Sequence, residues 1–152
     1  TILITSPEAG DGKSTVAQGL ATTMAEMGDE VVLVETDLRK GGLSGVKGPA
    51  TGLSNVLTGM PLQKALVRVR LSQQGMGSKR DLAVLPSGPT PPNPSELLNS
   101  KVMGRILEEF EQVGIIGALE VRFQDKTTGA HIDALWDLLR EQALSLRAGG
   151  TE

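Results

Sequence analysis

The stretch TILITSPEAGDGKST, residues 1–15, decides the fold class of this 152-residue chain. Its first residues form a short apolar run that is rich in β-branched side chains and ends at Pro7, which predicts a buried strand. After a Gly-rich turn, residues 12–28 carry apolar side chains at helical spacing and stop at Gly28. The run EVVLVE at 30–35 is typical of strands buried in parallel sheets. Strand, helix and strand in this order form a βαβ unit, so the class is α/β.

The rest of the chain adds further strands and helices to this unit. We expect strands at 82–85 and 113–116, short helical segments at 53–57 and 61–67, and a longer helix that starts at Ser95 as its N-cap. Residues 40–52 are rich in Gly, and five prolines lie between 86 and 94, so both segments are expected to be loops. The pattern predicts a mostly parallel sheet flanked by helices.

The composition excludes several kinds of function. Lys and Arg number 15 against 18 Asp and Glu, for a net charge of -3, so we expect no nucleic-acid partner. The chain has no Cys and a single His, which excludes a thiolate nucleophile, a Cys-based metal site and a His-rich zinc site.

The hydropathy pattern bears on membrane association. No apolar run approaches the roughly 20 residues that span a bilayer, and the first residues lack the basic flank and the long apolar stretch of a signal peptide. We therefore expect a cytoplasmic protein without direct membrane insertion.

The segment from Pro7 to Thr15 has the composition of a phosphate-binding loop between a strand and a helix. Gly10 and Gly12 let the backbone curl so that its N–H groups and the helix N-terminus face phosphate oxygens. Lys13 supplies a positive charge, and the Ser14 hydroxyl is a Mg²⁺ ligand in such loops. Pro7 stands where the strict pattern has its first Gly, and the alternative is a Gly-rich turn that binds nothing.

Two acids follow the second strand. Glu35 and Asp37 are two residues apart, which places them on the same side of the chain at the carboxyl edge of the sheet, where nucleotide sites of open α/β sheets form. Asp37 is placed to hold Mg²⁺, directly or through water, or to accept a hydroxyl proton. The alternative is a solvated acidic strand end.

Three segments resemble the bacterial tyrosine kinases of capsule and exopolysaccharide biosynthesis, which are P-loop proteins. They are TSPEAGDGKST at 5–15, VLVETDLRK at 32–40 and VLPSGPTPPNPSELL at 84–98, in the places of the Walker A motif, the Walker A′ motif and a long family-specific motif. The resemblance implies an ATP- and Mg²⁺-dependent kinase that transfers the γ-phosphoryl group to tyrosine. It also implies a membrane chain-length-determinant protein and sister subunits as partners, and a location at the inner face of the membrane through such a partner.

The resemblance implies roles for individual residues. Lys13 and Asp37 are the catalytic residues it indicates, with Asp37 as activator of the attacking hydroxyl. Mg²⁺ would be held by Ser14, Asp37 and Glu35, and Glu35 stands where the family usually has Asp. The residues for ATP are Gly10, Asp11, Gly12, Lys13, Ser14 and Thr15.

Departures from the family leave other functions open. Gly117 stands where the aspartate of the Walker B strand is expected, and the chain contains no Tyr, whereas the family ends in a Tyr-rich tail. The rival hypothesis is therefore a catalytically impaired nucleotide-binding or regulatory remnant. A third, an ATPase like MinD or ParA, is weakened because Glu8 replaces the signature lysine of those proteins.

The predicted domain organisation divides the chain after residue 117. Residues 1–117 form the nucleotide-binding core, which is incomplete relative to the family, and 118–152 an atypical ending. In that ending Leu119, Val121 and Phe123 alternate with polar residues, which predicts a strand at or near the sheet edge. Residues 131–146 form an amphipathic helix that we expect to pack on the core.

Overall fold

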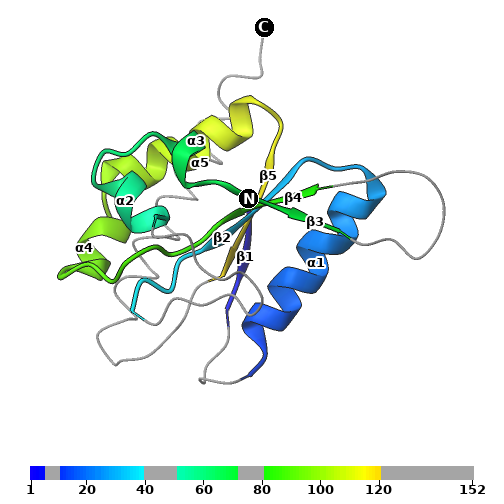
Figure 1. The fold of residues 1–152 in the computed structure, drawn as a ribbon, viewed down its shortest axis with the longest axis horizontal. Helices are drawn as coiled ribbons and strands as arrows, with labels where there is room; N and C mark the ends of the chain where they lie inside the picture. Colours follow the sequence, from blue (N-terminus) through cyan, green and yellow to red (C-terminus); the bar gives the residue numbers. More distant parts are fainter. Residues whose placement is uncertain (6–10, 40–50, 72–80, 121–152) are drawn as a thin grey trace, which may run out of the picture.

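The computed structural model of the chain describes residues 1–5, 11–39, 51–71 and 81–120. They form a five-stranded sheet with helices on both faces (Figure 1). The strands are β1 Ile2–Ile4, β2 Val31–Glu35, β3 Val67–Arg70, β4 Asp81–Leu85 and β5 Ile116–Glu120. Their order in the sheet is β1-β5-β2-β4-β3. The first four strands in this order are parallel to their neighbours, and β3 is antiparallel to β4, which confirms the predicted α/β class with a mostly parallel sheet.

The helix α1, Lys13–Met27, covers one face of the sheet. Its buried side is made of small residues, Ala17, Ala21 and Ala25, which let the helix lie close to Val31 and Leu33 of β2. It ends where the sequence predicts, because the Gly28 N–H donates to the carbonyls of Met24 and Ala25.

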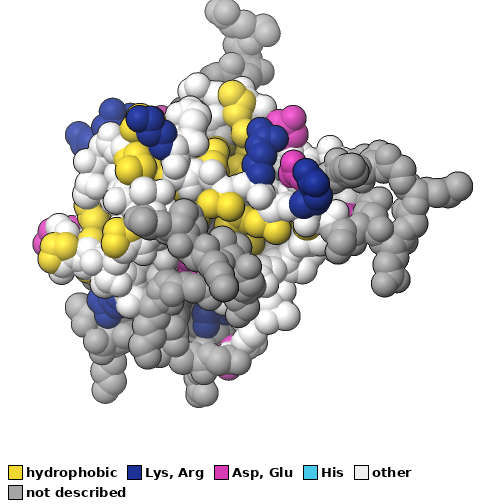
Figure 2. Space-filling view, in the orientation of Figure 1, with side chains coloured by type: hydrophobic (Ala, Val, Ile, Leu, Met, Phe, Trp, Pro, Cys, Tyr) yellow, Lys and Arg dark blue, Asp and Glu magenta, His cyan; other side chains and the backbone are white. Residues whose placement is uncertain are grey.

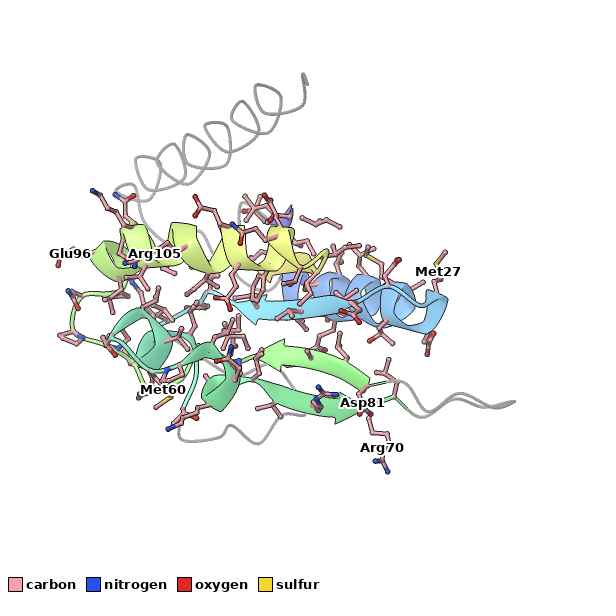
Figure 3. The ribbon with its side chains drawn as sticks, turned by 90° about the horizontal axis from the view of Figure 1, so that it is seen from above. Met27, Met60, Arg70, Asp81, Glu96 and Arg105 are labelled. Atoms are coloured by element: carbon pink, nitrogen blue, oxygen red, sulfur yellow. The ribbon has the colours of Figure 1, made fainter. Side chains whose placement is uncertain are left out.

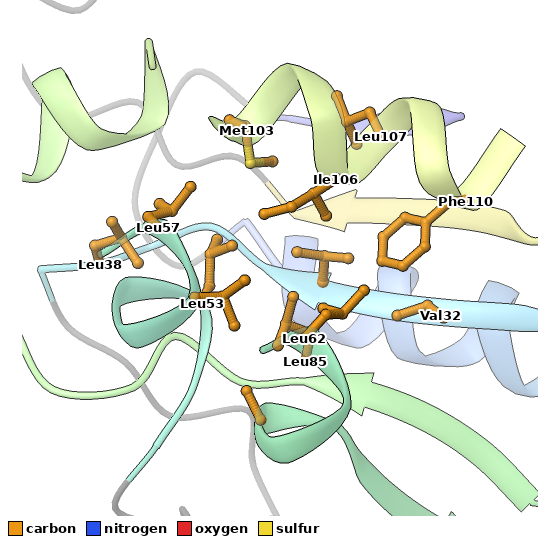
Figure 4. Close-up of a cluster of buried hydrophobic side chains, with 13 residues drawn as sticks. Val32, Leu38, Leu53, Leu57, Leu62, Leu85, Met103, Ile106, Leu107 and Phe110 are labelled. Carbon is orange, nitrogen blue, oxygen red and sulfur yellow. The ribbon is translucent and has the colours of Figure 1, made fainter. Parts of the chain in front are cut away.

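Four helices cover the opposite face (Figure 1). They are α2 Leu53–Leu57, α3 Leu62–Ala65, α4 Pro94–Leu98 and α5 Lys101–Gln112. Figure 4 shows apolar side chains of α2, α3 and α5 around Val32 and Leu85 of the sheet, with Phe110 and Leu107 of α5 among the fully buried members. Burying each such side chain contributes roughly 1.5–3 kcal/mol, so this cluster is the main core of the described residues.

The strand order sharpens one expectation. The sequence predicts Leu119 at or near the sheet edge, and Leu119 lies in β5, the second strand of the sheet, which pairs on one side with the edge strand β1 and on the other with β2. Leu119 is in register with Leu3 and Val34. Residues 119–123 alone alternate between apolar and polar types, which is typical of a half-exposed strand. The strand β5 begins earlier, at Ile116, and includes the small residues Gly117 and Ala118, which the alternating pattern does not contain. The strand β5 also crosses the expected domain boundary at 117. Val121, Phe123 and the expected helix at 131–146 lie outside the described residues.

Other element boundaries also differ from the expectation. The segment 113–115 connects α5 to β5 and is not itself a strand, since β5 begins at Ile116. The helix expected to start at Ser95 is two helices: α4 starts at Pro94 after Asn93, and Ser100 caps α5 by accepting from the Met103 N–H. The strand β3 was missed, although its sequence VRVR alternates in exposure as an edge strand does.

Acidic and basic side chains meet at one place on the face seen in Figure 2. In Figure 2 basic groups lie beside acidic ones near β3 and β4, where Arg70 and Asp81 form an exposed ion pair with 3.9 Å between Nε and Oδ1 (Figure 3). Such a pair contributes little to stability. Among the helices in the described ranges, none combines the length and the apolar character that crossing a membrane requires.

Candidate nucleotide site

Parallel strands bring several sequence motifs to one edge of the sheet. The strands β1, β5, β2 and β4 run in the same direction, so their carboxyl ends meet there (Figure 1). This edge of an open α/β sheet is where ligands bind. The helix α1 follows β1 and begins at the same edge with Lys13.

The start of α1 has the features of an anion-binding turn. Gly12 adopts a left-handed φ of 82° as N-cap, a conformation that a side chain would strain. Because the N-cap is glycine, it brings no capping side chain to the backbone N–H groups at the positive end of the helix. Lys13 is only 7% exposed, and Ser14 is half-buried. Asp11 and Thr15 are exposed beside them, whereas Gly10 lies outside the described residues.

The acid that ends β2 and the acid two residues after it have different environments. Glu35 is 4% exposed, and its Oε2 accepts a hydrogen bond of 2.9 Å from the backbone N–H of Ser87, across to the loop after β4. Asp37 is half-buried, and its Oδ1 accepts from the Arg39 N–H at 3.1 Å. Glu35 and Asp37, which the sequence places on the same side of the chain, thus accept hydrogen bonds from different backbone N–H groups.

The proline-rich loop after β4 is held in place by α2. The Leu53 N–H donates to the Pro86 carbonyl at 2.7 Å, and the Ser54 N–H donates to the Ser87 carbonyl at 3.0 Å. The Ser54 hydroxyl adds a bond of 2.8 Å to the Pro89 carbonyl. Sequence reasoning missed the Gly52–Ser54 contact with this loop, because no local pattern relates segments that lie more than thirty residues apart.

The register of β5 shows which of its residues lies at the carboxyl edge of the sheet. Gly117, where the Walker B aspartate is expected from the sequence, pairs with Val32 inside the sheet and is buried. The residue of β5 that pairs with Glu35, at the carboxyl end, is Glu120. Glu120 is therefore the acidic residue at the carboxyl end of β5, three positions after Gly117.

The donor groups at this edge fit a magnesium ion bound together with phosphates. No group of three or more His, Cys, Asp or Glu side chains is gathered for a metal within the ranges that the structure describes. Mg²⁺ bound with nucleotide needs only one or two protein oxygen ligands and takes the others from phosphates and water. A Ser14 hydroxyl and an Asp37 carboxylate are oxygen ligands of that kind.

Comparisons with known proteins decide the family. The chain is 39% identical over 111 residues to the tyrosine-protein kinase YwqD of Bacillus subtilis, an alignment that covers 72% of this chain and 44% of the relative. Among solved structures, the chimerical protein CapA2B2 matches with a TM-score of 0.69 and 30% identity, over 84% of this chain and 54% of that one. The kinase domain of the Escherichia coli tyrosine kinase ETK matches with a TM-score of 0.63 and 30% identity, over 80% and 46%. The chain belongs to the bacterial tyrosine kinases.

The chain spans about half the length of the family members it matches. No protein-family profile matches it. The structural neighbours include the tyrosine kinase domain of BceF and the kinase domain of ETK, and the chain covers 46% of each of these structures. Membership confirms the resemblance seen in the three sequence segments.

Proposed function

We propose that this chain is the ATP- and Mg²⁺-binding part of a tyrosine kinase that acts in capsular or exopolysaccharide biosynthesis. The observation that supports the proposal most directly is the buried Lys13 at the start of α1, at the sheet edge where Asp37 follows β2. Its relatives YwqD and CpsD of Streptococcus agalactiae are tyrosine-protein kinases.

In the proposed reaction ATP is a substrate. The N–H groups around Gly12 and the Lys13 ammonium bind its phosphates, and burial of Lys13 strengthens that interaction by excluding water. Ser14 and Asp37 would hold Mg²⁺, which neutralises charge on the phosphates when bound. The tyrosine oxygen bonds to the γ-phosphorus, the bond to the bridging oxygen of ADP breaks, and Asp37 takes the tyrosine proton. Most of the catalysis is positioning and charge stabilisation.

The acceptor tyrosine lies outside these residues, because the 152 residues contain no Tyr. We propose that it belongs to a sister subunit or another protein, and that a membrane chain-length-determinant protein recruits the kinase to the inner face of the membrane. The solved neighbour CapA2B2 is a chimerical protein, which is compatible with a kinase that joins another chain.

A second candidate function is a remnant that binds nucleotide without turnover. The buried Gly117 supports it, because a carboxylate expected from the family is missing at that position. Glu120 argues against it, since this residue gives β5 an acid at the register of Glu35.

One experiment separates these functions. Calorimetric titration with Mg-ATP measures binding, and transfer of radioactive phosphate to a tyrosine-containing polypeptide measures turnover, with Lys13→Met as the inactive control. The kinase proposal expects both signals. Binding without transfer, in the presence of a sister kinase chain as acceptor, would favour the remnant, and absence of binding would contradict both candidates.

A further inference from the structure

The segment after β2 that carries Asp37 is held in place on both sides. On the amino-terminal side, Glu35 accepts from the Ser87 N–H at 2.9 Å, with both residues less than 5% exposed. On the carboxyl-terminal side, Leu38 is 2% exposed and packs in the main core beside Leu57 (Figure 4). The Leu38 N–H also donates to the Thr36 carbonyl at 3.0 Å. The backbone of Asp37 therefore lies between two fixed points.

The loop that contains Ser87, the hydrogen-bond donor to Glu35, is itself fixed by several hydrogen bonds. Ser87 is held through its own carbonyl by the Ser54 N–H, and its neighbours Pro86 and Pro89 are held by Leu53 and by the Ser54 hydroxyl. A Cβ on Gly52 would collide with the Pro86 carbonyl, so this loop and the start of α2 are in contact without room for a side chain. The hydrogen bond between Glu35 and Ser87 thus connects β2 to a loop that is fixed on α2.

The length of the side chain matters for this bond. An aspartate at position 35 would withdraw the carboxylate by one carbon–carbon bond, about 1.5 Å. That shift takes the acceptor out of hydrogen-bond range of the Ser87 N–H unless β2 and the loop move together. A glutamine keeps the length and an accepting oxygen while losing the charge.

We propose that Glu35 is a positioning residue, which fixes Asp37 by accepting the Ser87 N–H and does not itself hold the metal. The inference rests on the proposed function, because Asp37 matters only if the site binds Mg²⁺ and nucleotide. The contact with Ser87 is the observation that carries it.

Two substitutions separate positioning from metal binding. A metal ligand tolerates Glu35→Asp better than Glu35→Gln, because only Asp keeps a charged oxygen. A positioning residue shows the reverse order. We therefore expect Glu35→Gln to leave the Mg²⁺ concentration for half-maximal nucleotide binding within about twofold of wild type, and Glu35→Asp to raise it about tenfold, a change of ~1.4 kcal/mol.

A second readout requires no ligand. Hydrogen exchange at the Ser87 N–H should keep its wild-type rate in Glu35→Gln and become at least about tenfold faster in Glu35→Asp. The matched controls are Glu30→Gln and Glu30→Asp, at an exposed residue just before the amino end of β2. Both should leave the exchange rate and the Mg²⁺ midpoint unchanged.

Three results would overturn the proposal. One is a raised Mg²⁺ midpoint in Glu35→Gln with a normal midpoint in Glu35→Asp, which identifies a metal ligand. Another is a wild-type Mg²⁺ midpoint and a wild-type Ser87 exchange rate in both Glu35→Gln and Glu35→Asp. If Glu35→Asp fails to fold, Ser54→Ala takes its place, because it removes the hydroxyl that holds the loop at Pro89. The third contradicting result is then faster hydrogen exchange at the Ser87 N–H in Ser54→Ala together with an unchanged Mg²⁺ midpoint. Lack of nucleotide binding by the wild-type chain would instead contradict the proposed function, and Ser87 exchange would still report whether Glu35 holds the loop.

Discussion

Gly52 and Gly88 approach each other so closely that a Cβ on Gly88 would lie 2.8 Å from the Gly52 backbone nitrogen. The same Cβ would lie 2.7 Å from the Ser54 hydroxyl oxygen. The proline-rich loop and the start of α2 can therefore form their hydrogen bonds only with glycine at these positions. This contact joins the start of α2 to the loop that follows β4 at the carboxyl edge of the sheet.

Gly88→Ala should destabilise the protein by more than its backbone conformation alone explains. Gly88 has a φ of 75° and would meet the atoms named above, whereas Gly114 has a φ of 74° and nothing within 4 Å. Gly114→Ala should thus cost about 1 kcal/mol from the positive φ, and Gly88→Ala roughly 1–3 kcal/mol more from the collision. Thermal unfolding followed by circular dichroism measures both. Equal melting temperatures for the two variants would show that the loop and α2 are not in close contact.

Lys13→Met should weaken nucleotide binding without unfolding the protein. Methionine keeps most of the apolar stem of this buried side chain but loses the charge that would contact phosphate. The loss of one charge-assisted contact corresponds to ~1.5–3 kcal/mol, about ten- to a hundredfold in affinity. Calorimetry with Mg-ATP is the measurement, with the exposed Lys101→Met as the matched control. If both variants bind Mg-ATP with the affinity of the wild type, Lys13 does not contact the nucleotide.

Asp37→Asn should lower turnover far more than nucleotide affinity. Asparagine still offers an oxygen to the Arg39 N–H, so the turn after β2 is preserved, but it cannot accept the tyrosine proton. We expect at least a hundredfold decrease in the rate of phosphate transfer, within the usual range for loss of a general base. The change in the dissociation constant of Mg-ATP should be about tenfold or less. Transfer at the wild-type rate would exclude Asp37 as the proton acceptor.

The sequence predicts the parts of this fold that depend on local pattern. The βαβ unit, the end of α1 at Gly28 and the strand at 82–85 follow from apolar periodicity and from glycine and proline positions. The place of β5 between β1 and β2 does not, because strand order is set by pairing between distant residues such as Leu3 and Leu119. The bond between Glu35 and Ser87 joins residues 52 apart in the chain and has no local signal. For the candidate site, sequence therefore identifies the residue types, and the tertiary contacts decide which acid is tied to the loop.

Gly117→Asp tests whether the third motif of the family is missing from this chain or displaced along it. By sequence alone, this substitution restores the family's aspartate and should raise activity. By register, position 117 pairs with Val32, whose side chain is 3% exposed, so the new carboxylate would be buried without a partner. We expect a loss of stability of roughly 3–5 kcal/mol, as for an uncompensated buried charge, and no gain in phosphate transfer. Chemical denaturation measures the first effect, with Gly117→Ala as control for the added side chain.

If the motif is displaced, a substitution at Glu120, at the end of the same strand, should have the opposite effects. Glu120 pairs with Glu35 and Ile4 at the carboxyl edge, so Glu120→Gln should lower phosphate transfer while the unfolding midpoint changes little. Transfer assays on both variants then give a two-way test. An active, stable Gly117→Asp protein together with an unaffected Glu120→Gln protein would mean that β5 is out of register by three residues, and that the family's carboxylate belongs at 117.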